Sequence, residues 1–205
     1  MKNSKLRRAL LLLASAVLLV SLSVGATLAY LTSEDSVRNT FVVGHVTITL
    51  DEADVKTDGT LDTDARVDAN EYKLYPGHTY IKDPIVHIAD DSENCWIFVE
   101  VVNGISAIED QENTILNQMT TLGWSKVDGE ENVYAYKEIV GAGMNIPVFT
   151  QFKIADTVDN DTLADYATKE NEDAVINVTA YAVQADGFGS AQAAWDAAKT
   201  ELYAD

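Results

Sequence analysis

The most constraining feature of this sequence is a series of short segments with strand composition, separated by turn residues about every eight to twelve positions. In NTFVVGHVTITL, the apolar residues at positions 42, 46, 48 and 50 face one way and their neighbours the other, which is the period of a strand. The dense apolar run CWIFVEVV indicates a buried strand, and NVYAYKEIV, NIPVFTQFKI and AVINVTAYAVQA indicate three more. The pattern predicts an all-β fold, an antiparallel jelly-roll-like sandwich of about six to eight strands with one or two peripheral helices.

The remaining segments refine this prediction. KLYPGHTYIKDPIVHIADD carries a Pro76-Gly77 turn and is interrupted at Pro84, so we expect a strand, a kink and a second strand. A short surface helix is expected in SAIEDQENTILNQMTTLGW, because its apolar residues recur at roughly helical spacing; they are Ile108, Ile115, Leu116 and Met119. A C-terminal helix is expected to begin near Ser190, which is a favourable N-cap residue before an alanine-rich stretch.

Residues 51–70 are polar, rich in aspartate and poor in aromatic residues, and we interpret them as a solvated acidic loop of the domain. Such a loop is the natural place to look for a calcium ion. The aspartate spacing does not match the helix-loop-helix calcium pattern, since Ala65 stands where that pattern needs a bidentate glutamate. Calcium at 51–70 therefore stays a weak alternative, and no cofactor is expected.

The first 29 residues have the organisation of a secretory signal peptide. Four basic residues lie among the first eight, an uncharged apolar segment follows, and small residues gather at its end. Cleavage is expected between Ala29 and Tyr30, with a cut after Ala26 as an alternative. The uncharged segment is also long enough to span a bilayer, so a retained membrane anchor is the competing interpretation. We favour removal, which makes the protein secreted and limits membrane contact to the signal peptide before cleavage.

The charge balance disfavours two anionic partners, nucleic acid and anionic lipid. The chain has 14 basic and 33 acidic residues, and loss of residues 1–29 leaves 10 basic and 33 acidic residues, a formal charge of −23. A field of this sign repels nucleic acid and anionic lipid and makes self-association depend on screening. Cys95 is the single cysteine and lies in the buried strand CWIFVEVV, so no intramolecular disulfide can form and a packing role is expected.

Four blocks of the sequence together resemble one known family. They are ATLAYLTSEDSVRNTFVVGHVTITL, YPGHTYIKDPIVHIADDSENCWIFVEV, GWSKVDGEENVYAYKEIV and INVTAYAVQADGFGSAQAAW. The chain is similar along nearly all its length, apart from residues 51–70 and the extreme C-terminus, to the TasA and camelysin family of Gram-positive bacteria. The resemblance implies a jelly-roll domain, export with cleavage by a dedicated signal peptidase, and assembly into extracellular biofilm-matrix fibres. It also implies that the mature N-terminal segment completes the sheet of a neighbouring subunit.

The sequence after the junction fits this implied role. Residues 30–40 are short, polar and extended in character, and we expect them to act as a donor strand in which Leu31 and Val37 are packing anchors between Tyr30 and Asn39. Residues 41–205 would then form the β domain. The leading hypothesis is a structural subunit that self-associates, with accessory matrix proteins and the cell wall as further partners.

Two alternatives remain open. A monomeric adhesion or binding module could use exposed aromatic residues, for which the candidates are Tyr72, Tyr75, Tyr80 and Trp124. A camelysin-like metalloprotease is the other, because some members of the family are labelled so. The histidines are His45, His78 and His87, none of them paired at helical spacing, and there is no H-E-x-x-H motif. We therefore expect neither a metal site nor catalytic residues, and no enzyme.

Overall fold

The computed structural model describes residues 32–35, 45–168 and 175–202. In this part of the chain the fold is mostly β, with antiparallel strand pairing throughout and three helices. None of these helices is long and apolar enough to cross a membrane. The predicted signal peptide, residues 1–29, lies outside the described residues.

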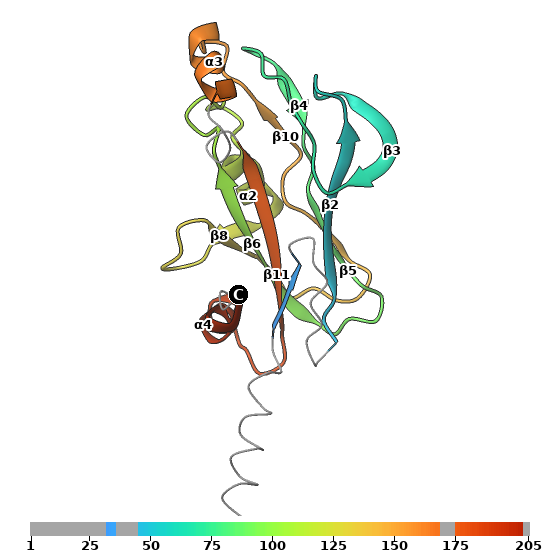
Figure 1. The fold of residues 1–205 in the computed structure, drawn as a ribbon. Helices are drawn as coiled ribbons and strands as arrows, with labels where there is room; N and C mark the ends of the chain where they lie inside the picture. Colours follow the sequence, from blue (N-terminus) through green and yellow to red (C-terminus); the bar gives the residue numbers. More distant parts are fainter. Residues whose placement is uncertain (1–31, 36–44, 169–174, 203–205) are drawn as a thin grey trace, which may run out of the picture.

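The larger sheet has five strands in the order β1-β11-β6-β8-β7. Their bounds are β1 Thr32–Asp35, β11 Ile176–Gln184, β6 Cys95–Asn103, β8 Val133–Tyr136 and β7 Trp124–Lys126. The central pair, β6 and β11, is in register over nine residues, from Asn103 opposite Ile176 to Cys95 opposite Gln184. Figure 1 shows β1 beside β11, so the first described strand lies at one margin of the sheet.

A second sheet has four strands in the order β3-β2-β5-β9, and a separate two-stranded sheet pairs β10 with β4. Their bounds are β2 Ile48–Val55, β3 Leu61–Val67, β4 Thr79–Ile81, β5 Ile85–Ile88, β9 Asn145–Pro147 and β10 Gln151–Lys153. The strand, kink and strand expected around Pro84 are confirmed by β4 and β5. NIPVFTQFKI is not one strand, because β9 and β10 belong to different sheets.

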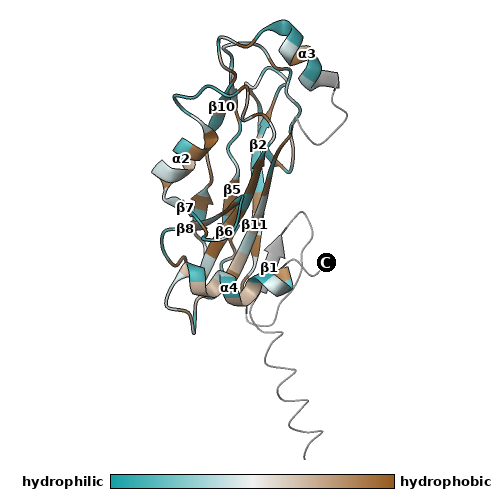
Figure 2. Ribbon diagram, turned by 90° about the vertical axis from the view of Figure 1, so that its left-hand side faces the viewer, coloured by the Kyte–Doolittle hydropathy of each residue, from teal (hydrophilic) through white to brown (hydrophobic). Residues whose placement is uncertain are grey.

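The main core lies between the two larger sheets. Val46 and Ile48 are buried while His45 and Thr47 are exposed, which confirms the two-residue period of this segment. Inward residues of both sheets, with aromatic residues of β4 and β10, form one cluster; it includes Val86, Ile97, Val99, Ala182, Tyr80 and Phe152. Figure 2 shows the corresponding hydrophobic stretches in the strands at the middle of the molecule.

A third layer covers the outer face of the five-stranded sheet. Helix α4, Ala191–Leu202, packs Trp195 against Phe98 and Tyr181, with ring centroids 5.0 and 5.7 Å apart. Ser190 begins this helix as expected, because its Oγ accepts a hydrogen bond from the Ala193 backbone N–H. Both faces of most of β6 and of the C-terminal half of β11 are therefore buried, which explains the nearly continuous apolar composition of these stretches.

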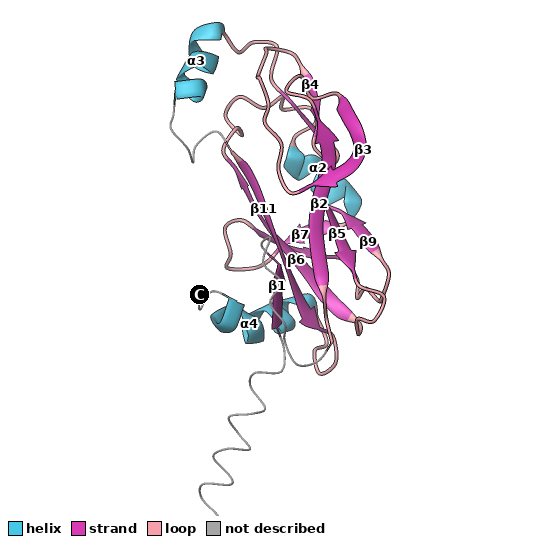
Figure 3. Cartoon of the chain, turned by 45° about the vertical axis from the view of Figure 1, so that its right-hand side comes forward, coloured by secondary structure: helices cyan, strands magenta, loops and turns pink. Residues whose placement is uncertain are grey.

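The other two helices lie away from α4 (Figure 3). Helix α2, Ile115–Leu122, confirms the predicted surface helix, and its N-cap Thr114 accepts from the Asn117 N–H. Ile115 and Met119 are buried, whereas Leu116 is 43% exposed and does not belong to the packed face. Helix α3, Asn160–Thr168, was not expected, so the prediction of one or two helices was too low.

The prediction of an acidic loop at residues 51–70 is wrong, because most of this segment is a β-hairpin formed by β2 and β3. Its turn needs Gly59, whose φ of +78° favours glycine. Every β3 residue from Leu61 to Arg66 is exposed. The strand therefore has no buried face and no alternation of apolar residues that sequence reasoning could detect.

Candidate assembly edge and adjoining cavity

Strand β11 offers a long edge that β1 covers only in part. The pairing runs antiparallel from Thr32 opposite Val183 to Asp35 opposite Ala180. Residues 180–184 of β11 are buried, and those from 176 to 179 are half-buried or exposed. Within the described ranges, no strand pairs with Ile176–Thr179 on the side of β11 that faces away from β6.

The two faces of β11 differ in what they contact. Ala180 and Ala182 face the core between the sheets, and Ile176 and Val178 pack against that same core. Tyr181 and Val183 face the layer formed with α4. A strand added along this edge would therefore place alternate side chains against the inter-sheet core and against α4.

The outer strands of the other sheet margins are poor templates for strand addition. Strand β7 is three residues long and ends at Lys126, and β9 contains Pro147, which has no N–H to donate. Strand β3 exposes Asp62 and Asp64 on a margin of the four-stranded sheet. Charges, proline and short length are the devices that blunt exposed sheet edges.

The connection between β1 and β2 joins two defined positions. Asp35 lies opposite Ala180, in the middle of β11. His45, which precedes β2, accepts a hydrogen bond of 2.7 Å from the Glu93 N–H, and the neighbouring Asn94 accepts one of 2.8 Å from the Ala185 N–H. The body of the domain therefore resumes beside the C-terminal end of β11, and the N-terminal end of β11 points away from it.

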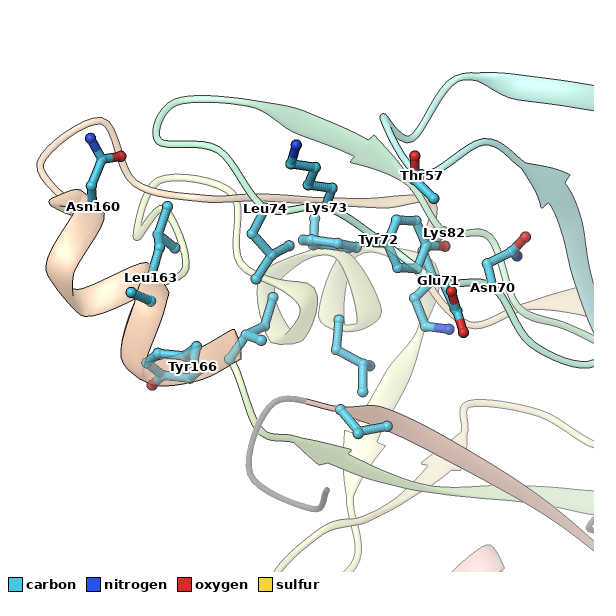
Figure 4. Close-up of a pocket in the computed structure, with 15 residues that line it drawn as sticks. Thr57, Asn70, Glu71, Tyr72, Lys73, Leu74, Lys82, Asn160, Leu163 and Tyr166 are labelled. Atoms are coloured by element: carbon cyan, nitrogen blue, oxygen red, sulfur yellow. The ribbon is translucent and has the colours of Figure 1, made fainter. Parts of the chain in front are cut away.

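A cavity of about 700 Å³ opens at that N-terminal end. Val175 and Ile176 form part of its wall, α3 contributes Leu163 and Tyr166, and the chain before β4 contributes Tyr72 and Leu74, among other residues. Figure 4 shows the side chains of α3 and those of residues 72 and 74 on facing sides of the cavity. Most of this lining is apolar.

The two lysines of the cavity wall, Lys82 and Lys73, have partners, and Glu71 adds a carboxylate to the lining. Lys82 forms an ion pair with Glu52, a carboxylate that also accepts a hydrogen bond of 2.8 Å from Asn70 Nδ2. Both charged side chains are nearly buried, at 11% and 5% exposure. Lys73 places its ammonium 5.5 Å from the centre of the Tyr75 ring. The cavity is therefore suited to an apolar side chain more than to a charged ligand.

A polar group on the outer face of the four-stranded sheet contains one of the histidines. His87 Nε2 lies 2.9 Å from Asp51 Oδ1, and its Nδ1 contacts Asn145. Arg66 bridges Asp51 and Asp83. Burial works against the charged Asp51, but hydrogen bonds from Arg66 and His87 outweigh it and lower the pKa of this carboxyl. The group has the geometry of a cross-strand ion-pair network.

The other two histidines and the cysteine, which were candidates for a metal-binding or catalytic role, do not form one site. His45 is exposed beside Asp91, and His78 Nε2 lies 2.8 Å from the Asp58 carbonyl oxygen. Among the residues that the structure describes, no three histidine, cysteine or acidic side chains form a group able to hold a metal ion. Cys95 is fully buried, as predicted, and burial raises the pKa of its thiol to about 12.

One buried carboxylate, Glu109, has a structural role that the sequence did not reveal. Its Oε1 accepts a hydrogen bond of 2.6 Å from the Ile115 N–H at the start of α2, and its Oε2 accepts one of 2.9 Å from Asn103 Nδ2. Burial raises the pKa of Glu109. It ties α2 to the end of β6, and an acidic residue several positions before an apolar helix was the only signal.

The predicted site residues fall mostly outside the described residues. These are the cleavage pair Ala29 and Tyr30 and the donor-strand positions Leu31, Val37 and Asn39, whereas 32–35 of the donor segment form β1. The aromatic residues proposed for adhesion do not form an exposed surface: Tyr80 and Trp124 are buried, Tyr72 is half-buried, and only Tyr75 is exposed. Sequence reasoning missed the edge of β11 and the cavity.

Comparisons with protein-family models, with curated proteins and with solved structures found no match to this chain. Membership of the TasA and camelysin family therefore stays a prediction from sequence resemblance. The geometry of the β11 edge and of the cavity is the basis for the functional argument.

Proposed function

We propose that this protein is an exported structural subunit that polymerises into extracellular matrix fibres by donating its N-terminal strand to a neighbouring subunit. The observation that carries the proposal is the half-covered edge of β11, a nine-residue strand with only four residues paired to β1. The pairing within one chain is then the resting state. In a fibre, the same segment of the next subunit would take its place.

The chain connection gives exchange a geometric advantage. Within one chain, residues 36–44 must connect the middle of β11 with the end of β11 where His45 lies. A strand from another subunit has no such constraint and can continue along the edge. In the register of β1 it would set Val37 opposite Val178 and Asn39 opposite Ile176. Leu31 would lie opposite Gln184, on the same face as Val37.

The expected gain in free energy is small. Extension by residues 36–39 adds about four backbone hydrogen bonds, each worth about 1 kcal/mol net. Burial of the Val37 side chain adds about 1.5–3 kcal/mol. Ordering the added residues costs about 1–2 kcal/mol each. Assembly by this route should therefore be slow and dependent on concentration.

The rest of the proposal follows from the sequence resemblance. A signal peptidase would cleave between Ala29 and Tyr30 and release the mature chain outside the cell. The sandwich would have the jelly-roll connectivity of the family, and the protein would act without catalysis or cofactor. Accessory matrix proteins and the cell wall are the further partners that we propose.

Truncation tests the proposal. Mature chain beginning at Tyr30 should form fibres visible by electron microscopy, whereas chain beginning at Thr40 should keep a native-like circular dichroism spectrum and a cooperative melt but form no fibres. Leu31→Asp should also prevent fibres. Leu61→Asp is a matched control, because Leu61 is 56% exposed on the hairpin and should tolerate the charge.

Normal fibres from the chain that begins at Thr40 would refute strand donation. In that case a monomeric adhesion module, or assembly through another surface, would explain the protein better. Intact-mass measurement of the secreted chain tests the cleavage site independently. A secreted chain that retains residues 9–29 would support a membrane anchor instead.

A further inference from the structure

We propose that the cavity at the N-terminal end of β11 is the seat for Phe41 of the donating subunit, which fixes successive subunits head to tail. This inference rests on the strand donation proposed above. It adds a second contact, beyond the strand, and names the occupant of the cavity as a second copy of this chain.

The direction of β11 determines where a donor strand would leave the acceptor. A donor strand antiparallel to β11 enters beside Val183 and runs toward Ile176. Since Asn39 would stand opposite Ile176, the chain would leave the edge where Val175 and Ile176 form the cavity wall. Phe41 follows two residues later, about 7 Å further along an extended chain.

The alternation of side chains along the donor strand determines which way Phe41 would point. Side chains two residues apart in a strand point to the same side, so Val37, Asn39 and Phe41 share one face. By the register, this is the face of Val178 and Ile176, which both pack against the inter-sheet core. Ile176 lines the cavity from that face. Phe41 would thus point into the cavity and not toward α4.

The chemistry of the cavity wall favours an aromatic occupant. The cavity presents Tyr72, Leu74, Phe152, Leu163 and Tyr166, which suit an aromatic side chain. Its two lysines are engaged, Lys82 with Glu52 and Lys73 with the Tyr75 ring. A small anionic ligand would find little free positive charge there, and a mature chain with a formal charge of −23 would repel it.

The arrangement sets the direction of the fibre. The domain of the donor resumes at His45, shortly after Phe41. The donor would therefore rest its His45 end on the α3 end of the acceptor. Figure 1 shows α3 at the opposite end of the molecule from α4 and β1. This contact is heterologous, and such a contact builds an open fibre when the rotation between successive subunits does not close into a ring.

Disulfide cross-linking between variants that each carry one introduced cysteine tests the seat directly. Mature Phe41→Cys chain is mixed with mature Leu163→Cys chain under assembly conditions, oxidised, and analysed on non-reducing gels with mass spectrometry. A disulfide between the two variants can form only between subunits. The native Cys95 does not interfere, because it is fully buried and its pKa is raised to about 12.

Two further pairs control the experiment. Val37→Cys with Val178→Cys reports strand donation itself, and Phe41→Cys with Leu61→Cys reports chance collision at an exposed site. Because docking raises the local concentration of the two thiols to about the millimolar range, the Phe41–Leu163 dimer should exceed the Leu61 control by about tenfold or more. Circular dichroism confirms that each variant is folded.

The outcomes separate the two proposals. Cross-linking of both the Val37–Val178 and the Phe41–Leu163 pairs supports donation and the seat. Cross-linking of Val37–Val178 alone overturns the seat and leaves donation in place. Absence of both, with or without fibres, overturns both proposals. Cross-linking of Phe41–Leu163 alone overturns strand donation in the proposed register.

Discussion

Replacement of Lys82 by methionine should destabilise the domain strongly, because it leaves a charge unpaired inside the protein. Lys82 and Glu52 form an ion pair in which the two side chains are only 11% and 5% exposed. Asn70 Nδ2 donates to the other carboxylate oxygen of Glu52. Without Lys82, that single amide would be the remaining donor to the Glu52 side chain among the described residues.

The expected cost of Lys82→Met is about 3–5 kcal/mol, the range for removing one partner of a buried ion pair. Glu52→Gln in the same chain should recover at least about 1 kcal/mol, since contacting partners couple by amounts of this order. The amide oxygen of the new glutamine can still accept from Asn70, and no charge is left buried. The double variant should therefore be more stable than Lys82→Met alone.

Urea denaturation followed by circular dichroism measures these differences. With a slope of about 2 kcal/mol per molar urea, Lys82→Met should lower the midpoint by about 1.5–2.5 M. Lys56→Met is the control, because Lys56 and Asp62 form an exposed pair at 3.9 Å. Such pairs contribute about 0–1 kcal/mol. A midpoint for Lys82→Met close to that of the control, or a double variant no more stable than the single, would refute the reasoning.

Three further predictions concern stability. Trp195→Ala should cost about 3–5 kcal/mol in urea denaturation because it empties the layer between α4 and the sheet, and a loss below about 1 kcal/mol would contradict that layer. Gly59→Ala should lower the melting temperature more than Gly129→Ala; both glycines have positive φ, but only at Gly59 would a Cβ meet another residue, 2.6 Å away. Because the pKa of Asp51 is lowered, its stabilisation is present above about pH 4 and is lost as the pH falls through the lowered value. Arg66→Gln should therefore flatten the acid limb of stability against pH.

The strands with a buried face could be predicted from the sequence. Val46 and Ile48 alternate with exposed neighbours, and Cys95 begins a run that is buried because α4 covers one face of β6 and the inter-sheet core covers the other. Ser190 predicted the start of α4, because its hydroxyl caps the first turn of the helix. In each case the residue types record a local physical requirement.

The elements that were missed have no such local record. Strand β3 is exposed along nearly its whole length, and helix α3 buries little, with Leu163 and Tyr166 half-buried. The cavity is formed by side chains from residues 57 to 176, and the edge of β11 depends on which strands flank it. Both features depend on residues far apart in the sequence. Sequence reasoning could therefore propose a donor strand but not the edge that receives it.

The same strand can both protect the monomer and build the proposed fibre. A long, apolar edge such as that of β11 invites uncontrolled pairing when it is bare. Strand β1 shields the half at Ala180–Val183, the half whose residues are buried, and among the described residues no strand pairs with Ile176–Thr179 on the side opposite β6. A donor must therefore displace four pairs before it gains its full length, which makes the first exchange slow and favours addition to an end where the acceptor edge is already vacated. If strand donation holds, fibre growth should follow from the vacant β11 edge of the last subunit, and the blunted edges at β3, β7 and β9 should keep the fibres from merging sideways.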